Sequence, residues 1–271
     1  MTIGIVGLGL MGGSFSRAIK KYTEHRVLVW NRSAATAEKA VSEGAADGIL
    51  TDDALAGCDL IIVCLYPQLT VDWIRGHAHL IGKDTLVTDT CGVKRFVCDA
   101  VEPIAREHGF TFIGGHAMAG REQSGYDAST PELFRGASMI LTAPEPPRIW
   151  KDLAPALGFS MVKCTTPEEH DKMISFTSQL AHVVSGAYVK SPSALEHKGF
   201  SAGSFKDLTR VAYLNENMWT ELFLENRDNL SFEIEHIIEE LQKYRDALDA
   251  GDAEALKEIL KEGRLRKEQT L

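Results

Sequence analysis

The stretch that decides the fold is Gly7-Leu8-Gly9-Leu10-Met11-Gly12, which follows the apolar run Thr2 to Val6 and opens a helical pattern from Leu10 to Tyr22. A Gly-x-Gly-x-x-Gly pattern between a strand and a helix is the fingerprint of a Rossmann-like dinucleotide-binding unit. The first glycine permits a tight turn, the second lets the backbone approach a pyrophosphate, and the third lets the helix pack on the sheet. We therefore expect all six residues to line a dinucleotide site.

The sequence around this loop alternates between strand and helix patterns. A second apolar run, Arg26 to Trp30, precedes an Ala-rich helical stretch from Ser33 to Glu43. Such alternation predicts an α/β fold with a doubly wound, mostly parallel sheet that is covered on both faces. Further strands are predicted at Leu60–Leu65, Thr85–Asp89, Phe110–Ile113, Ser138–Thr142 and Phe159–Lys163.

From Pro167 onward the sequence shows only helical patterns, broken at Ser191-Pro192 and around Gly199 to Gly203. Pro167 suits the first position of a helix, and the acidic residues after it suit the positive end of the helix dipole. We predict a dinucleotide-binding Rossmann domain over residues 1–165 and an all-helical substrate and dimerisation domain over residues 166–271. The helices of this second domain have apolar faces wider than the core of one monomer requires, which favours a homodimer through this domain.

Composition narrows the classes of partner. A formal net charge of -9 leaves no excess of Lys and Arg for binding nucleic acid. The longest apolar run, Leu60 to Leu65, is too short to span a membrane, and no basic leader precedes the first strand, so we expect a cytoplasmic protein. The five cysteines include no C-x-x-C pair, and we therefore expect neither a disulfide framework nor a metal site.

The end of the second strand bears on the choice between NAD and NADP. An NAD enzyme usually places an acid there for the ribose 2'-hydroxyl, whereas an NADP enzyme places an arginine for the 2'-phosphate. This chain has Asn31, Arg32 and Ser33 at that point. Arg32 suits a phosphate and Ser33 adds a hydroxyl donor, which favours NADP. NAD stays open, because Asn31 can also hydrogen-bond a bare ribose.

A candidate catalytic histidine follows the strand predicted at Phe110–Ile113. The segment Gly114-Gly115-His116-Ala117-Met118-Ala119-Gly120 lies at the carboxyl end of that strand, where open α/β sheets bind ligands. Small neighbours leave room for a ligand beside His116, and an ordinary histidine pKa lies near working pH. The alternative is a histidine with a purely structural role.

At this point the chain resembles the prephenate and arogenate dehydrogenase family of tyrosine biosynthesis. Gly7 to Ser14 match the family's G-L-G-L-x-G-G-S, and His116 to Gly120 match its H-P-M-A-G except that Ala117 replaces the proline. Further similar blocks occur in order, at Arg121 to Gly125, Phe205 to Arg210, Met218-Trp219 and Asn226-Arg227.

The resemblance implies an oxidoreductase that oxidises and decarboxylates prephenate to 4-hydroxyphenylpyruvate while NAD or NADP is reduced. His116 would take the proton of the ring hydroxyl, and Arg210 would bind a substrate carboxylate. His182 would line the substrate site from the helical domain, together with Gly120 and with Gln179, which stands where the family often has another histidine. The alternative for Arg210 is a surface ion pair with Asp207, three residues earlier.

One departure from the family falls in its D-x-G-S-x-K motif, which appears here as Asp89-Thr90-Cys91-Gly92-Val93-Lys94. In the family the serine helps to orient the catalytic histidine, and Gly92 stands in its place. We expect the hydroxyl of Thr90 or Ser124, or water, to replace it. Cys91 is interpreted as a small residue near the nicotinamide, and Lys94 as either part of the site or a solvated charge.

Three alternatives to prephenate oxidation remain. Arogenate differs from prephenate only by an amino group in place of the side-chain keto group, and no residue distinguishes the two. A β-hydroxyacid dehydrogenase would need a lysine in a Gly-rich helical start, a setting that neither Lys172 nor Lys190 has. A non-catalytic nucleotide sensor would have no need of both His116 and Arg210.

Overall fold

The central strands fill two cores with alternating residues. The structure is a computed structural model that describes residues 1–121 and 123–270. In β1 (Thr2–Val6), Ile3 and Ile5 pack with α1 (Leu10–Tyr22) on one face of the sheet, and Val6 packs on the other. Successive side chains of a strand point to opposite faces, so an unbroken apolar run requires cover on both. The predicted doubly wound architecture is confirmed.

The main sheet has six strands in the order β3-β2-β1-β4-β5-β6, and all of its pairs are parallel. The order reverses beside β1, and ligands bind at such a switch point in open α/β sheets. The remaining elements of this layer are β2 (Arg26–Trp30), β3 (Gly48–Ile49), β4 (Leu60–Val63), β5 (Leu86–Asp89), β6 (Thr111–Ile113), α2 (Ala34–Ser42), α3 (Asp52–Leu55), α4 (Pro67–His77) and α5 (Arg95–His108).

A second, three-stranded sheet was not expected. It has the order β7-β8-β9, in which β7 and β8 are antiparallel and β8 and β9 are parallel. The strands predicted at Ser138–Thr142 and Phe159–Lys163 therefore pair with each other, and the first of them also pairs with β7. Neither extends the main sheet. The elements are β7 (Gly115–Ala117), β8 (Ser138–Leu141), α6 (Arg148–Ala156) and β9 (Met161–Cys164).

The chain after β9 is helical, as predicted. Thr166 caps the first of these helices, where its side chain accepts the Glu169 N–H. The segment Ser175–Leu180 forms a π-helix, a wide turn that often occurs near functional sites. The helices are α7 (Pro167–Ile174), α8 (Ala181–Tyr188), α9 (Gly203–Thr209), α10 (Glu216–Glu225), α11 (Arg227–Ala250) and α12 (Ala253–Glu268). The division at residue 165 stays a prediction.

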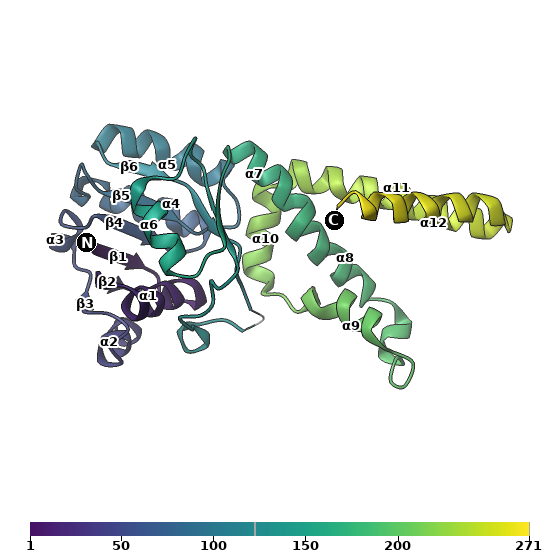
Figure 1. The fold of residues 1–271 in the computed structure, drawn as a ribbon, viewed down its shortest axis with the longest axis horizontal. Coiled ribbons are helices and arrows are strands. Elements are labelled where there is room, and N and C mark those ends of the chain that lie inside the picture. The colour runs from purple at the N-terminus through teal and green to yellow at the C-terminus, as the bar shows by residue number, and fades with distance from the viewer. Residues whose placement is uncertain (122, 271) are drawn as a thin grey trace.

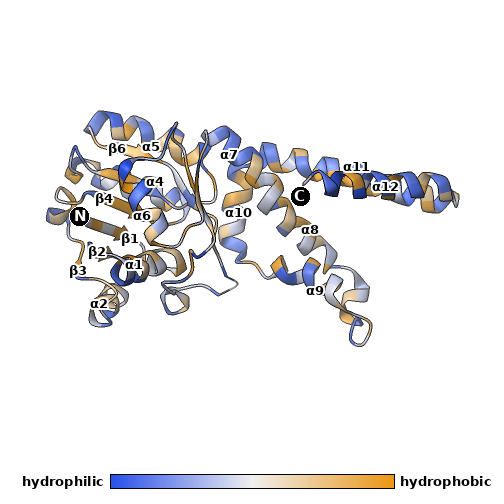
Figure 2. Ribbon diagram, viewed as in Figure 1, coloured by the Kyte–Doolittle hydropathy of each residue, from blue (hydrophilic) through white to orange (hydrophobic). Residues whose placement is uncertain are grey.

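The two halves meet along α7 and α10, and α11 and α12 extend away from the sheet as a long pair (Figure 1). Hydrophobic residues concentrate inside the sheet domain but also recur along that extended pair (Figure 2). None of the helices within residues 1–121 and 123–270 has the length and apolar character needed to cross a membrane.

Candidate active site

The Gly-rich loop has the shape that a dinucleotide requires. Gly7 has φ +89°, and a Cβ there would lie 2.7 Å from the Cys64 carbonyl oxygen. A Cβ on Gly12 would lie 1.8 Å from the Gly7 carbonyl oxygen, so only glycine allows α1 to start here. A Cβ on Gly9 would meet nothing within 4 Å. The loop is therefore open at Gly9, beside the amino end of α1, where a pyrophosphate fits.

The polar residues after β2 divide into a structural residue and an exposed pair. Asn31 Oδ1 accepts the Leu8 N–H at 2.9 Å and so ties the Gly-rich loop to the end of β2. Arg32 and Ser33 are exposed beside it. The carboxamide oxygen of Asn31 is thus engaged by the protein, whereas Arg32 and Ser33 face solvent at the edge of the nucleotide site.

A buried ion pair fixes the strand that carries His116. Asp89 Oδ1 accepts the Gly115 N–H at 2.9 Å, and Lys94 Nζ donates to the Gly115 carbonyl oxygen at 2.6 Å and to Asp89 Oδ2. A Cβ on Gly115 would lie 2.6 Å from the Asp89 carbonyl oxygen, so glycine is needed where β7 crosses the end of β5. Lys94 is fully buried, and the alternative of a solvated surface charge is wrong.

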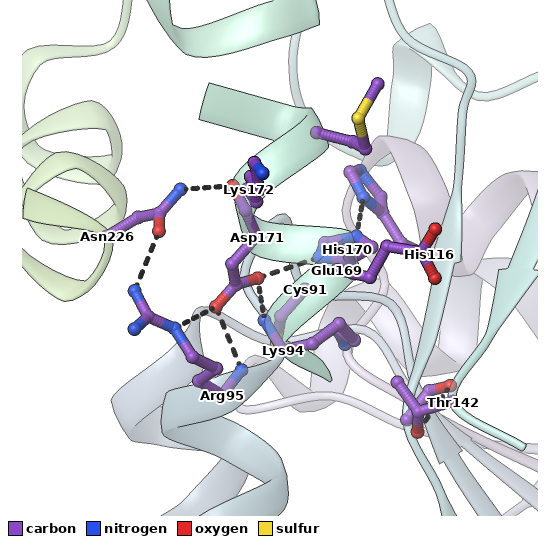
Figure 3. A network of polar contacts seen from close by, with 12 residues as sticks. Cys91, Lys94, Arg95, His116, Thr142, Glu169, His170, Asp171, Lys172 and Asn226 are labelled. Carbon is purple, nitrogen blue, oxygen red and sulfur yellow. Dashed lines mark hydrogen bonds and ion pairs between the residues drawn. The ribbon is translucent and has the colours of Figure 1, made fainter. Parts of the chain in front are cut away.

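The hydrogen-bond partner of His116 comes from the helical half of the chain. His116 Nδ1 lies 2.9 Å from His170 Nε2, and His170 Nδ1 lies 2.7 Å from Asp171 Oδ1 (Figure 3). The structure gives His116 a partner other than Thr90 and Ser124, and the expectation that one of these hydroxyls, or water, replaces the family serine stays a prediction. His170 and Asp171 were missed because no known spacing links them to His116. Their one signal was an adjacent His-Asp pair in the first helix after the predicted boundary.

Burial keeps this pair of histidines neutral. Burial, followed by the neighbouring His170 and Lys94, holds the pKa of His116 well below its ordinary value. Burial also lowers the pKa of His170 and outweighs the opposing hydrogen bond to Asp171. Burial acts to raise the pKa of Asp171. Hydrogen bonds from His170 and from backbone N–H groups act in the opposite direction and outweigh it, so the pKa lies below its ordinary value and the carboxylate is ionised.

The predicted substrate-binding residues His182 and Arg210 lie together. His182 Nδ1 lies 2.9 Å from the carbonyl oxygen of Val211, the residue after Arg210. Arg210 is exposed, and its charge helps burial to lower the pKa of His182, although burial is the larger cause. The ring of His182 packs on Trp219 with centroids 3.9 Å apart.

One face of α10 connects this group with His116. A Cβ built on Gly92 would lie 3.4 Å from a methyl carbon of Leu222 and 4.0 Å from His116 Cε1. Trp219 and Leu222 are three residues apart on α10 and share a face of the helix. Gly92 therefore lies between His116 and Leu222, and His182 packs on Trp219 about one turn away on the same face of α10. The space that the family serine would take lies beside Leu222.

Other predicted site residues are placed differently. Gly120 and Ser124 lie after β7 and are exposed. Glu122, which belongs to the family-like block Arg121 to Gly125, lies outside the described residues. Gln179 is buried, where it accepts from Asn226 at 2.8 Å and donates to the Leu222 carbonyl at 3.1 Å, so its amide is not available to substrate.

Thr90 and Cys91 directly follow β5, where Thr90 is half-buried and Cys91 is buried. The Thr90 hydroxyl hydrogen-bonds the Cys64 thiol. The buried Cys91 thiol faces Thr70 at 3.4 Å, and burial holds its pKa well above the ordinary value. The interpretation of Cys91 as a small residue near the nicotinamide stays a prediction. Within the described ranges, the His, Cys, Asp and Glu side chains form no group of three suited to a metal ion.

Comparison with known proteins covers both halves of the chain. Residues 15–151 match the family model described as prephenate dehydrogenase, nucleotide-binding domain, and residues 166–262 match prephenate dehydrogenase, dimerization domain. The chain is 30% identical to the cyclohexadienyl dehydrogenase of Zymomonas mobilis, over 96% of this chain and 92% of that protein. It is 31% identical to the prephenate dehydrogenase of Bacillus subtilis, over 94% of this chain and 72% of that protein.

A solved structure shares the whole architecture. The crystal structure of prephenate dehydrogenase from A. aeolicus, in complex with hydroxyphenyl propionate and NAD+, superposes with a TM-score of 0.85 at 27% identity. The match covers 100% of this chain and 98% of that one. The helical half thus has the same arrangement relative to the sheet domain as in that relative.

Proposed function

The chain belongs to the prephenate dehydrogenase family, and from this premise we propose that it oxidises and decarboxylates prephenate to 4-hydroxyphenylpyruvate with a nicotinamide nucleotide. The expected family and the expected class of enzyme, an NAD(P)-dependent dehydrogenase, are confirmed. The glycine geometry of residues 7–12 fits the nucleotide, which supplies the hydride acceptor when bound.

His116 is the residue on which the proposal rests. Its ring is partly exposed, is held by β7 at the end of β5, and has a pKa that keeps it neutral. A neutral imidazole accepts the proton of the ring hydroxyl while the ring carbon that bears this hydroxyl gives up a hydride. The ring carboxylate then leaves as CO2, and the electrons of the broken bond complete the aromatic ring. His116 returns its proton to the oxygen, which ends as a phenol.

Arg210 and His182 bind the substrate on the helical side. A guanidinium binds a carboxylate with two parallel hydrogen bonds, which suits one of the two carboxylates of prephenate. His182 holds the segment that carries Arg210 through the Val211 carbonyl. This placement is supported by α10, whose Leu222 lies beside Gly92 near His116 and whose Trp219 packs on His182.

We infer that the preferred nucleotide is NADP. Asn31 is engaged with Leu8, which leaves Arg32 and Ser33 as the exposed polar groups at the point where a 2'-phosphate lies in NADP enzymes. NAD is the competing nucleotide.

The assembly is proposed to be a homodimer through the helical domain, in the cytoplasm. A match to a dimerization-domain model supports the dimer, as do the exposed apolar side chains of the extended helices. These are Phe232, Ile238, Leu241 and Leu248 on α11 and Leu260 and Leu265 on α12.

The experiment is an assay of the purified protein with prephenate or arogenate, each with NADP or NAD, while the absorbance of reduced nicotinamide is followed. We expect turnover with prephenate, fastest with NADP. Turnover with arogenate alone would replace the substrate but keep the chemistry. No turnover in any of the four combinations would overturn the proposed function.

A further inference from the structure

The proposed function leaves one feature of the site unexplained, the hydrogen-bonded series formed by the side chains of His116, His170 and Asp171. His170 is 2% exposed and Asp171 is 0% exposed, and both come from α7, which opens the helical half. His170 lies between the other two side chains, and Asp171 points to His170 and to the start of α5, as Figure 3 shows.

We propose that the Asp171–His170 pair positions His116 and fixes which of its ring nitrogens is free to accept a proton. This inference rests on the proposed function, because it concerns the base of that reaction. His170 and Asp171 act through His116 and are positioning residues.

The assignment of hydrogens follows from the carboxylate. Ionised Asp171 can only accept, so His170 Nδ1, at 2.7 Å from it, carries a hydrogen. Neutral His170 then has no hydrogen on Nε2 and accepts from His116 Nδ1 at 2.9 Å. Neutral His116 therefore has an unprotonated Nε2 as its remaining nitrogen. A proton can be accepted only there, on the side of the ring away from His170.

The surroundings hold Asp171 in this state. Its Oδ1 accepts the Lys94 N–H at 2.7 Å and its Oδ2 accepts the Arg95 N–H at 3.0 Å, both at the start of α5. The Arg95 guanidinium also donates to Oδ2 at 3.4 Å. Asn226 donates to the Asp171 backbone carbonyl at 2.8 Å and accepts from Arg95 at 3.1 Å. Groups from both halves of the chain thus keep the carboxylate charged and immobile.

The ring of His116 is held on its Nδ1 side by His170, and a Cβ built on Gly92 would lie 4.0 Å from its Cε1. Other titratable groups near the three side chains are Asp89 at the end of β5, Lys94 and Arg95 at the start of α5, and Glu225 on α10, where burial raises the pKa of the carboxyl to about 8. None of them makes a described hydrogen bond to the His116 ring.

The test compares two substitutions of similar size at position 170. Gln places an amide near the position of Nε2, where its oxygen can accept from His116, whereas Leu offers no polar atom. We expect His170→Leu to lower kcat by about 100-fold or more, with KM within a few-fold of wild type, because a misplaced general base loses its contribution. His170→Gln should keep at least ten times the kcat of His170→Leu. His79→Leu, at an exposed histidine, is the matched control and should keep full activity.

Three further measurements separate positioning from packing. Nucleotide dissociation constants and Tm should be similar in the Leu and Gln variants. The acid limb of kcat/KM should move to lower pH in His170→Leu, because leucine cannot accept the hydrogen bond from His116 Nδ1 that stabilises the protonated ring. In wild type, the nitrogen chemical shifts of His116 should report hydrogen on Nδ1. This last measurement needs no variant and applies even if both substitutions prevent folding.

The outcomes also distinguish this inference from the function on which it rests. If wild type fails to oxidise prephenate, the proposed function is wrong. If wild type turns over but His170→Leu matches it in kcat and pH profile, only the positioning role is wrong. Equal losses in the Leu and Gln variants would point to packing and overturn the hydrogen-bond role. Hydrogen on Nε2 of wild-type His116 would do the same.

Discussion

At the scale of single residues, the proposed site depends on a histidine that stays neutral because it is partly buried and lies near the Lys94 ammonium. Burial is the largest cause of its low pKa, and His170 and Lys94 add to it. A base must be unprotonated before the substrate arrives, so a low pKa widens the pH range in which the enzyme is competent. The cost is a weaker driving force for taking the proton.

The pH dependence follows from this shift. Activity is lost as pH falls through the pKa of His116, because protonation removes the accepting lone pair. Since that pKa is well below the ordinary 6.5, kcat/KM should be unchanged down to pH 6.5 and fall only in more acidic solution. Initial rates measured from pH 5 to 8, about the range in which histidines titrate, check this prediction. A midpoint at or above 6.5 would contradict the assigned environment.

Nucleotide choice is also decided by single residues. Replacing Arg32 with Ala should raise KM for NADP by about 10- to 100-fold, the loss expected for a hydrogen bond to a charged group. Because NAD lacks the 2'-phosphate, KM for NAD in the same variant should stay within about two-fold of wild type. Initial rates at varied nucleotide concentration measure both. Equal losses with both nucleotides would mean that Arg32 does not contact the 2'-phosphate.

The sequence identifies the residues that belong to continuous motifs and misses those that meet only in the fold. His116 and the glycines of residues 7–12 stand in short patterns with a known mechanical reason. His170 lies 54 positions after His116, and only the docking of α7 brings the two rings together. The burial of Lys94 was undecided for the same reason, since its partners Asp89 and Gly115 lie on different strands.

At the scale of elements, the strand-to-helix turn at residues 7–12 works because its glycines have different tasks. Gly12 is fixed by packing, since a Cβ there would overlap the Gly7 carbonyl oxygen, whereas Gly9 borders open space. The turn therefore combines one glycine for folding with another for a ligand. Substitution should separate these tasks.

Alanine at each of the two positions tests this division. Gly12→Ala forces α1 to shift and should destabilise the fold by about 1–3 kcal/mol or more. Gly9→Ala should leave Tm unchanged but weaken nucleotide binding by about ten-fold, because a methyl group blocks the approach of the pyrophosphate. Thermal unfolding and nucleotide titration of both variants provide the check. Equal Tm losses would refute the assignment of Gly9 to the ligand.

The longer elements of the fold were predictable and the shortest ones were not. β1, β2 and α1 have the predicted bounds, because apolar runs and glycine spacing specify them locally. β3, with only Gly48 and Ile49, and β7, with three residues, contain no pattern of their own. They are strands because neighbouring strands offer hydrogen-bond partners, which a local pattern does not reveal. The same non-local pairing separates β8 and β9 into a second sheet.

At the scale of the whole molecule, the proposed site draws on both halves of the chain. The nucleotide loop and His116 belong to the sheet domain, whereas Arg210, His182 and the His170–Asp171 pair come from the helices. Several contacts cross between them, including Glu221 on α10, which accepts the Gln68 N–H at the start of α4 at 2.7 Å. The geometry at His116 therefore depends on how the helical half docks.

The exposed apolar face of the extended helices should be covered by a second copy. Light scattering should give twice the mass of one chain for wild type. Leu241→Glu places a charge in that face, where the side chain is 61% exposed in the single chain, and should yield a monomer. Met161→Glu, at a 55% exposed residue of β9 in the sheet domain, is the control and should remain dimeric. A monomeric wild type would contradict the proposed assembly.

The most direct test of the proposed chemistry is the turnover of His116→Asn with saturating prephenate and NADP. Asn keeps a polar side chain but cannot take up a proton, so kcat should fall by about 100- to 10,000-fold, the usual contribution of a general base. Nucleotide affinity and Tm should match wild type, because the Gly-rich loop is untouched. A variant that turns over at the wild-type rate would show that the proton goes elsewhere and that the central role given to His116 is wrong.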